Sequence, residues 1–303
     1  PHLEEWLALS KPDIVALQEI KMETKAFPVD ALRALGYESI ASGQKTYNGV
    51  ALLARAAPTD IVTDIPGFAD EQRRVLAATV GDLRIDDLYV VNGQEVGSDK
   101  YRYKLDWLAA VTDWLRAEIA KHPKLVVLGD FNIAPDDRDV HDPEAWHEQV
   151  LCSKPERDAL KRILALGLHD SFRLKDASPG QFSWWDYRQA AFRRNLGLRI
   201  DLVLISEALR ASLQSVGIDR VPRTWERPSD HAPAWIELGG ATTGVARRGY
   251  RRSQYKAAAN ATAMGPNQLI SCKVLPANSG SRRGRPRPRK AMWVATPLPI
   301  IDR

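Results

Sequence analysis

Short apolar segments that end at an acidic residue are the feature that most constrains how this sequence folds. Residues 125–128 are wholly apolar and are followed by Gly129-Asp130, and residues 14–17 are followed by Gln18-Glu19. Apolar runs of this length are typical of strands that are buried on both faces. Such strands need helices or a second sheet to cover them. The pattern therefore predicts a layered fold of sheet and helix.

Strands and helices alternate along residues 1–238. We predict strands at 13–18, 49–53, 75–80, 83–91, 125–128, 200–205 and 234–238, and helices at 29–35, 103–121 and 155–166. The helix at 103–121 carries an apolar stripe at helical spacing, with Leu105, Leu108 and Val111 on it. This mixture predicts the α/β class, with helices covering the faces of a sheet.

The charge of the chain is unevenly distributed. The net charge is +5, but residues 241–303 carry 13 of the 43 lysines and arginines and a single acid, Asp302. We therefore predict a net acidic folded domain over 1–240 and a basic, Pro/Arg-rich tail over 241–303 that is disordered or contacts DNA. Such a domain can bind nucleic acid only through a local basic face and a bound cation.

Composition limits the class and location of the protein. With 44% hydrophobic and 27% charged residues, the chain is an ordinary globular protein. It has no apolar run of 18 residues, so we expect no membrane association. The two cysteines, Cys152 and Cys272, fit no zinc spacing and favour a reducing, cytoplasmic setting.

Acidic residues stand at the ends of four predicted strands. Glu19 and Asp130 follow strands, Asp201 begins one, and Asp230 precedes another. Ligands of α/β sheets bind at such strand ends, and carboxylates gathered there would repel one another without a cation. Oxygen ligands in this number suit Mg²⁺ or Mn²⁺. The alternative for any single acid is that it caps a helix or a turn.

Two of these motifs divide a chemical task between neighbours. In Asp130-Phe131-Asn132 the carboxylate can accept a proton from water, while the amide holds that water or a phosphate oxygen. In Asp230-His231 the carboxylate can reach a metal while the imidazole faces a phosphate. A second carboxylate on the other ring nitrogen would fix the tautomer, and Asp201 is the candidate. The motifs predict metal-assisted phosphoester chemistry.

Seven segments carry a resemblance to a known family. They are 17–21 (LQEIK), 49–52 (GVAL), 88–94 (LYVVNGQ), 129–132 (GDFN), 182–188 (FSWWDYR), 197–201 (GLRID) and 229–233 (SDHAP). In this order they resemble the exonuclease III family of bacterial AP endonucleases, within the endonuclease/exonuclease/phosphatase superfamily. GDFN and SDHAP mark only the superfamily, whereas 92–100, 182–188 and 197–201 are typical of its DNA-repair branch.

The resemblance implies two mixed sheets flanked by helices and a monomeric enzyme of base-excision repair. Its activities would be 3′→5′ exodeoxyribonuclease on double-stranded DNA and AP endonuclease on abasic-site DNA, with Mg²⁺ or Mn²⁺ as cofactor. The implied metal ligands are Glu19, Asp130, Asn132, Asp230 and His231; the implied catalytic residues are Tyr89, Asp130, Asn132, Asp201 and His231; the implied DNA-binding residues are Lys21, Lys100, Trp184, Arg188 and Arg199.

The resemblance also implies separate roles within the catalytic set. Asp130 would activate or position the attacking water, with Asn132 beside it. Tyr89 and His231 would hydrogen-bond the scissile phosphate, and Asp201 would orient His231.

The aromatic and basic residues have alternative interpretations. Trp184 would probe the abasic gap or the sugar pocket, whereas Trp185 is expected in the core. Arg193 and Arg194, near Arg188, would supply phosphate contacts or plain surface charge. A second candidate for phosphate contact is the segment after the Gly97 turn, with Lys100, Arg102 and Lys104.

The sequence departs from the family pattern at its start. The family begins with a strand that bears an active-site Asn, and this chain starts after it, at Pro1-His2-Leu3. We therefore expect the sheet to lack its first strand. Two other functions stay open: a phosphoesterase acting on a small phospho-ligand, against which 182–188 argues, and a truncated, inactive DNA-binding remnant.

Overall fold

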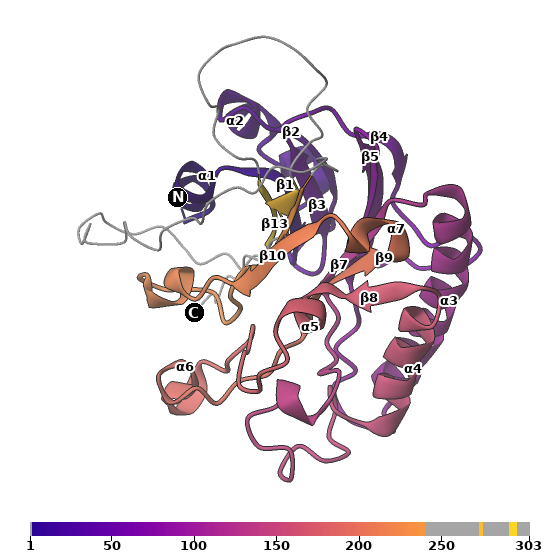
Figure 1. Cartoon of the computed structure of the whole chain (residues 1–303), viewed down its shortest axis with the longest axis vertical. Helices are drawn as coiled ribbons and strands as arrows, with labels where there is room; N and C mark the ends of the chain where they lie inside the picture. The colour runs from indigo at the N-terminus through magenta and orange to yellow at the C-terminus, as the bar shows by residue number, and fades with distance from the viewer. Residues whose placement is uncertain (1, 240–272, 275–290, 296–303) are drawn as a thin grey trace.

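The computed structural model describes residues 2–239, 273–274 and 291–295 (Figure 1). The helices are α1 (His2–Ser10), α2 (Val29–Ala34), α3 (Asp99–Lys121), α4 (Lys154–Leu164), α5 (Ser171–Lys175), α6 (Ala191–Arg194) and α7 (Glu207–Arg210), with 3₁₀ turns η1 (Thr24–Ala26), η2 (Asp137–Asp139), η3 (Arg188–Ala190) and η4 (Val221–Thr224). The strands are β1 (Pro12–Gln18), β2 (Glu38–Ser42), β3 (Val50–Ala54), β4 (Thr59–Val62), β5 (Val75–Val80), β6 (Leu83–Tyr89), β7 (Leu125–Asp130), β8 (Leu168–Asp170), β9 (Asp201–Ser206), β10 (Leu213–Ile218), β11 (Ala234–Leu238), β12 (Lys273–Val274) and β13 (Ala291–Ala295).

The strands form two sheets packed face to face. One has the order β10-β11-β13-β1-β3-β2, with β12 beside β11, and the other has the order β4-β5-β6-β7-β9-β8. Both are mixed, because β1 runs parallel to β13 and antiparallel to β3, while β6 runs parallel to β7 and antiparallel to β5. The predicted α/β sandwich of two mixed sheets is confirmed.

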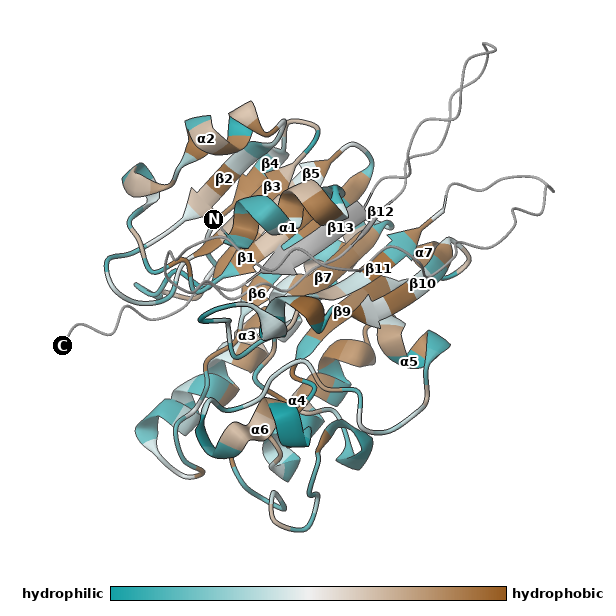
Figure 2. Cartoon of the chain, turned by 90° about the vertical axis from the view of Figure 1, so that its left-hand side faces the viewer, coloured by the Kyte–Doolittle hydropathy of each residue, from teal (hydrophilic) through white to brown (hydrophobic). Residues whose placement is uncertain are grey.

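The apolar core lies in three layers. The first lies between the sheets and includes Leu52 of β3 and Leu128 of β7. Helices α3 and α4 cover the outer face of the β4–β8 sheet, with Trp107 in that layer. Helices α1 and α2 cover the opposite outer face, with Trp6 in that layer (Figure 1). Since β7 is covered on both faces, its wholly apolar sequence is explained, and Figure 2 shows the same apolar centre.

Strand β13 lies between β1 and β11. It pairs in parallel with β1, from Pro12↔Ala291 to Leu17↔Ala295, and antiparallel with β11. Strand β1 therefore has a hydrogen-bonded neighbour on each side. The rest of the predicted tail (241–272, 275–290 and 296–303) lies outside the described residues, as does residue 240, so the domain boundary at 240 stays a prediction. No helix in the described part of the chain has the length and apolarity needed to cross a bilayer.

The ends of several strands bring polar side chains to one edge of the two sheets. Strand β6 ends at Tyr89, β7 ends at Asp130 and β9 begins at Asp201. These residues are register partners, Tyr89 with Asp130 and Asp130 with Asp201. At the end of β1, the Gln18 side chain donates to Asp87 of β6 at 2.5 Å. The end of β1 in one sheet therefore meets β6 of the other at the same edge.

Gly129 allows β6 and β7 to lie close together just before Asp130. Its φ is 135°, and a Cβ built on it would lie 2.0 Å from the carbonyl oxygen of Leu88. Because that neighbour is backbone within a sheet, it cannot move aside as a flexible side chain would.

Replacing Gly129 with Ala should therefore destabilise the fold by at least about 2 kcal/mol, through backbone strain and overpacking. The measurement is the free energy of unfolding of the full chain by urea denaturation. Gly81→Ala is the matched control, since Gly81 also has a positive φ (65°) but nothing lies within 4 Å of its added Cβ. It should cost only about 1 kcal/mol. Equal losses for the two variants would contradict the steric explanation.

Candidate active site

Asp130 is held by the loop that follows β7. Its carboxylate accepts hydrogen bonds from the backbone N–H of Asn132 at 2.9 Å and from the Asn132 side-chain amide at 3.1 Å. Burial raises the pKa of Asp130 to about 8, with the charge of His231 opposing the rise and those of Asp201 and Glu19 adding to it. A carboxyl with a pKa near neutrality is suited to take a proton from water.

Asn132 is fixed in a left-handed conformation, with φ of 47°. Its amide nitrogen also donates to the Val90 carbonyl at 3.0 Å, and its amide oxygen accepts from Asn92 at 3.1 Å. The nitrogen rather than the oxygen of this amide therefore faces Asp130. In this geometry Asn132 orients Asp130, and its amide oxygen is already engaged by Asn92.

His231 and Asp201 form a buried pair. The Nδ1 atom of His231 lies 2.9 Å from both carboxylate oxygens of Asp201, and Ser229 Oγ accepts the backbone N–H of His231 at 2.9 Å. Burial alone would lower the pKa of His231, but the charge and hydrogen bond of Asp201, with Asp130 and Asp230, outweigh it and raise that pKa to about 10. The ring is therefore a cation at neutral pH, with Nε2–H available as a donor.

Glu19 follows β1 and is contacted from the other sheet. The Tyr89 hydroxyl donates to its carboxylate, and Lys21 Nζ lies 2.8 Å from the second oxygen. Burial raises the pKa of Tyr89, so its phenol stays protonated and can donate. The guanidinium of Arg74 lies 4.6 Å from the Tyr89 ring centroid, which holds the ring from one face.

Ligand atoms suited to a divalent cation gather at this edge. Within the described residues, one ligand atom each from Asp130, Asp201 and His231 lies within 4.8 Å of the others, and all three residues are buried. The charge of Glu19 acts on Asp130, and that of Asp230 acts on His231. A hard cation fits the carboxylates of this set, because buried carboxylates this close need an opposite charge. His231 would have to lose its Nε2 proton before it could act as a metal ligand.

Asp230 is held by the tryptophan segment. Trp184 donates from Nε1 to the Asp230 carboxylate at 3.0 Å, and the backbone N–H of Trp185 donates to the Asp230 carbonyl at 2.9 Å. Trp184 is half-buried, and its bond to Asp230 places it beside that residue; its role at an abasic gap stays a prediction. Trp185 is fully buried, which confirms its predicted place in the core.

The predicted DNA-binding residues divide by exposure. Lys100 and Arg188 are exposed, and Arg188 also pairs with Asp186 at 2.6 Å. Lys21 pairs with Glu19 and so lies at the site itself. Arg193 and Arg194 are exposed on the short helix α6.

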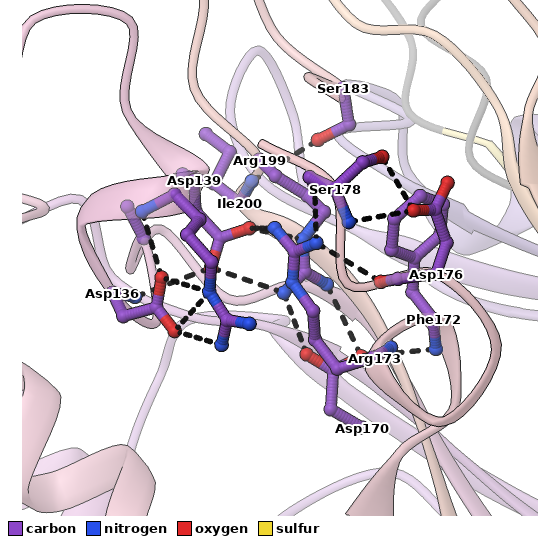
Figure 3. Close-up of polar contacts among 12 residues, drawn as sticks. Asp136, Asp139, Asp170, Phe172, Arg173, Asp176, Ser178, Ser183, Arg199 and Ile200 are labelled. Carbon is purple, nitrogen blue, oxygen red and sulfur yellow. Dashed lines mark hydrogen bonds and ion pairs between the residues drawn. The ribbon is translucent and has the colours of Figure 1, made fainter. Parts of the chain in front are cut away.

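Arg199 and Lys104 correct the prediction. Arg199 is only 1% exposed, and its guanidinium is held by Asp139 and Asp170 (Figure 3). Lys104 is fully buried, and its Nζ donates to Glu156 and to the carbonyl of Asn132 at 2.7 Å. Neither cation can reach a phosphate, because its charge is already paired within the interior.

Three supporting residues were missed by sequence reasoning. They are Asn92, which holds the Asn132 amide, Arg74, which stacks on Tyr89, and Ser183, whose Oγ accepts the backbone N–H groups of Ile200 and Asp201, both at 3.1 Å. Asn92 and Ser183 lie inside motifs that carried the family resemblance, so position within a motif was the available signal. Arg74 lies in none of these motifs, so no sequence signal marked it.

Comparison with known proteins agrees with this geometry. Residues 2–231 match the model of the Endonuclease/Exonuclease/phosphatase family. The chain is 36% identical over 252 residues to an exodeoxyribonuclease III of Haemophilus influenzae, which covers 78% of this chain and 94% of that protein.

Solved structures of similar proteins share the fold. NExo of Neisseria is 48% identical, with a TM-score of 0.76 over 77% of this chain and 91% of that one; it is described as a 3′–5′ exonuclease and, bound to a product DNA hairpin, as a 3′ phosphatase. An AP endonuclease of Archaeoglobus fulgidus is 33% identical, with a TM-score of 0.73 over 76% and 90% of the two chains.

These matches confirm the family predicted from the motifs. The match to the exodeoxyribonuclease spans most of both chains, and the family model, over residues 2–231, includes all of the strand ends described above. This chain belongs to the endonuclease/exonuclease/phosphatase family, in its exodeoxyribonuclease III branch.

Proposed function

We propose that this protein is a Mg²⁺-dependent phosphodiesterase of base-excision repair, with 3′→5′ exonuclease activity on duplex DNA and endonuclease activity at abasic sites. The observation that carries the proposal is the compact group of Asp130, Asp201 and His231. It combines a carboxyl whose pKa lies near neutrality with an imidazolium held by a second carboxylate. A proton acceptor and a hydrogen-bond donor this close suit the attack of water on a phosphodiester.

In this mechanism Asp130 accepts the proton of the attacking water. Asn132 keeps the Asp130 carboxylate in place through two hydrogen bonds. His231 donates from Nε2 to a phosphate oxygen, while Asp201 holds its Nδ1–H. Tyr89, whose hydroxyl donates to Glu19 in this structure, would become a second donor to the phosphate when a cation binds Glu19.

The site would hold Mg²⁺ or Mn²⁺ through Glu19 and Asp230, with Asp130 close by. The cation would offset the negative charge that builds on the phosphate and on the leaving 3′ oxygen. Trp184 holds Asp230 toward the site. Lys21 accompanies Glu19 and balances part of its charge before the substrate arrives.

DNA would be bound by loops around this edge, with Lys100, Trp184 and Arg188 as contacts. Lys100 and Arg188 are exposed, and Trp184 is accessible beside Asp230. The partners would be double-stranded DNA and abasic-site DNA. The proposal also includes that the protein is a monomer and works in the reducing cytoplasm.

A second candidate activity is removal of a 3′-terminal phosphate. It is favoured by the 48% identity to NExo, whose structure with a product DNA hairpin is described as that of a 3′ phosphatase. The same proton acceptor and hydrogen-bond donors would act in this reaction. In phosphatase and nuclease chemistry alike, water attacks a phosphorus atom that is bonded to a 3′ oxygen.

Three DNA substrates separate these activities. They are a duplex with an internal abasic site, an intact duplex with a recessed 3′ end, and the same duplex carrying a 3′ phosphate. An inositol phosphate tests the small-ligand alternative. We expect Mg²⁺-dependent cleavage of DNA and none of the inositol phosphate. Binding of DNA without EDTA-sensitive cleavage of any of the three would contradict the proposal.

Asp130→Asn should lower the cleavage rate by at least about 10²-fold, because it removes the proton acceptor. DNA affinity in EDTA should be kept near neutral pH, because Asp130, whose pKa is raised to about 8, already carries little negative charge in the metal-free protein. The rate is measured on abasic duplex, and affinity by fluorescence anisotropy. Asp158→Asn is the control, since Asp158 is an acid on α4 that pairs with Lys154. A rate for Asp130→Asn close to that of the unchanged protein would rule out Asp130 as the base.

Metal affinity should depend on pH through Asp130. In the metal-free protein the pKa of this carboxyl is raised to about 8, so its proton must leave before the carboxylate can face a cation. The apparent affinity for Mn²⁺ should rise about tenfold per pH unit below about pH 8 and level off above it. Calorimetric titration measures this dependence. In Asp130→Asn the affinity for Mn²⁺ should change little with pH over this range. An unchanged slope in that variant would mean that a group other than Asp130 releases the proton.

A further inference from the structure

Arg199 lies at the centre of a buried ion-pair network under the active-site edge (Figure 3). It forms two bonds to each of two carboxylates: Nε and Nη2 bind Asp139 at 2.6 and 3.2 Å, and Nη2 and Nη1 bind Asp170 at 2.6 and 3.2 Å. Arg173 also pairs with Asp139, so two guanidinium groups meet two carboxylates and the cluster is neutral. A neutral cluster with close hydrogen bonds is the form in which buried charges are tolerated, and here Arg173 Nε is the buried donor that has no hydrogen-bond partner within the described residues.

The network joins three segments that are far apart in the chain. Asp139 belongs to η2 after β7, and Asp170 ends β8 and caps α5 through the backbone N–H of Phe172 at 3.1 Å. Arg199 itself lies just before β9. Its backbone N–H also donates to the Asp139 carbonyl at 2.9 Å. The position of the β9 start is therefore set by bonds to both of its neighbouring segments.

Asp201 is two residues beyond Arg199 and continues the same chain of bonds. Ser183 Oγ accepts the backbone N–H groups of Ile200 and Asp201, both at 3.1 Å, and the Ile200 carbonyl accepts the backbone N–H of Phe131 at 2.9 Å. A pocket of about 10 Å³, which has room for about one water, is lined by Phe172, Arg199 and Asp201 among others. Arg199 and Asp201 therefore border the same small space.

We infer that Arg199 is a positioning residue for the reaction, acting through Asp201 on His231, and is not a contact for DNA. The inference rests on the proposed function of the same site. Its physical basis is the fork of the guanidinium, which fixes two carboxylates in one plane. A lysine at 199 keeps the charge but cannot make both pairs, so one carboxylate is left partly unpaired and the start of β9 shifts.

The kinetics of Arg199→Lys test this in the full chain. The kcat on abasic duplex should fall about 10–100-fold, as for groups that orient a catalytic histidine. The KM for DNA and the salt dependence of binding should stay unchanged. Arg173→Lys is the matched control, because Arg173 also pairs with Asp139 but does not belong to the segment that continues to Asp201. The kcat of this variant should stay within about threefold of that of the unchanged protein. A raised KM with a weaker salt dependence and an unchanged kcat would make Arg199 a DNA contact and overturn the inference.

A double-mutant cycle with Asp201→Asn separates positioning from general stability. If Arg199 acts through Asp201, adding Arg199→Lys to Asp201→Asn should cost less than about threefold in kcat. A full multiplicative loss in the double variant would overturn the inference. Rates are taken per folded molecule, at a temperature where thermal unfolding shows all variants folded. If Arg199→Lys does not fold, Asp170→Asn takes its place in the same cycle, since it weakens the same network while keeping an oxygen to cap α5.

A substrate-free readout distinguishes this inference from the proposed function. The ¹⁵N chemical shift of His231 Nδ1 reports its hydrogen bond to Asp201 whether or not the protein cuts DNA. Arg199→Lys should move that signal and Arg173→Lys should leave it in place. An unmoved signal in Arg199→Lys would refute the inference, whereas absence of Mg²⁺-dependent cleavage by the unchanged protein would refute only the proposed function.

Discussion

The crowding of carboxylates at one edge of the sheets is the constraint on which this structure depends. Asp130 and Asp201 face each other as register partners on adjacent strands, and both are buried. Two such groups side by side are unfavourable unless protons, cations or hydrogen bonds compensate them. His231 supplies a positive charge to the pair, and a divalent cation would supply more. This repulsion would be relieved by a bound cation, and that cation, together with His231, would then stabilise the negative charge of a transition state.

Buried cations hold the loops of this edge in place. Lys104 binds the carbonyl groups of Asn92 and Asn132, and Glu156 neutralises it. Arg199 likewise holds the start of β9, and the carboxylates of Asp139 and Asp170 neutralise its charge. In both cases an oppositely charged partner lies at hydrogen-bonding distance, so the cost of removing the charges from water is met locally. The catalytic loops therefore rest on ion pairs inside the protein rather than on apolar packing alone.

Much of the fold could be predicted from the sequence, because buried strands and amphipathic helices have strong periodic signals. The strands at 75–80 and 234–238 were predicted at their observed bounds, and the strand ends that carry Asp130 and Asp201 lie together as expected. Short edge strands such as β4 and β8 were not predicted, since few residues and partial exposure leave little pattern. Strand β13 was missed because its place depends on β1 and β11, which are distant in sequence.

Whether each arginine is exposed or buried could not be predicted from the sequence, because exposure depends on the tertiary structure. Arg188 and Arg199 stand in equally good motifs, yet one is exposed and the other is fully enclosed. The two differ in their surroundings: Arg199 meets Asp139 and Asp170, which are 60 and 29 residues away, whereas the charged partner of Arg188 among the described residues is its neighbour Asp186. With Arg199 and Lys104 withdrawn into the interior, the basic face is smaller than the sequence suggests. Under the proposed function, binding of DNA by residues 1–240, which carry more acids than bases, would then depend more on a metal and on Trp184 than on bulk positive charge.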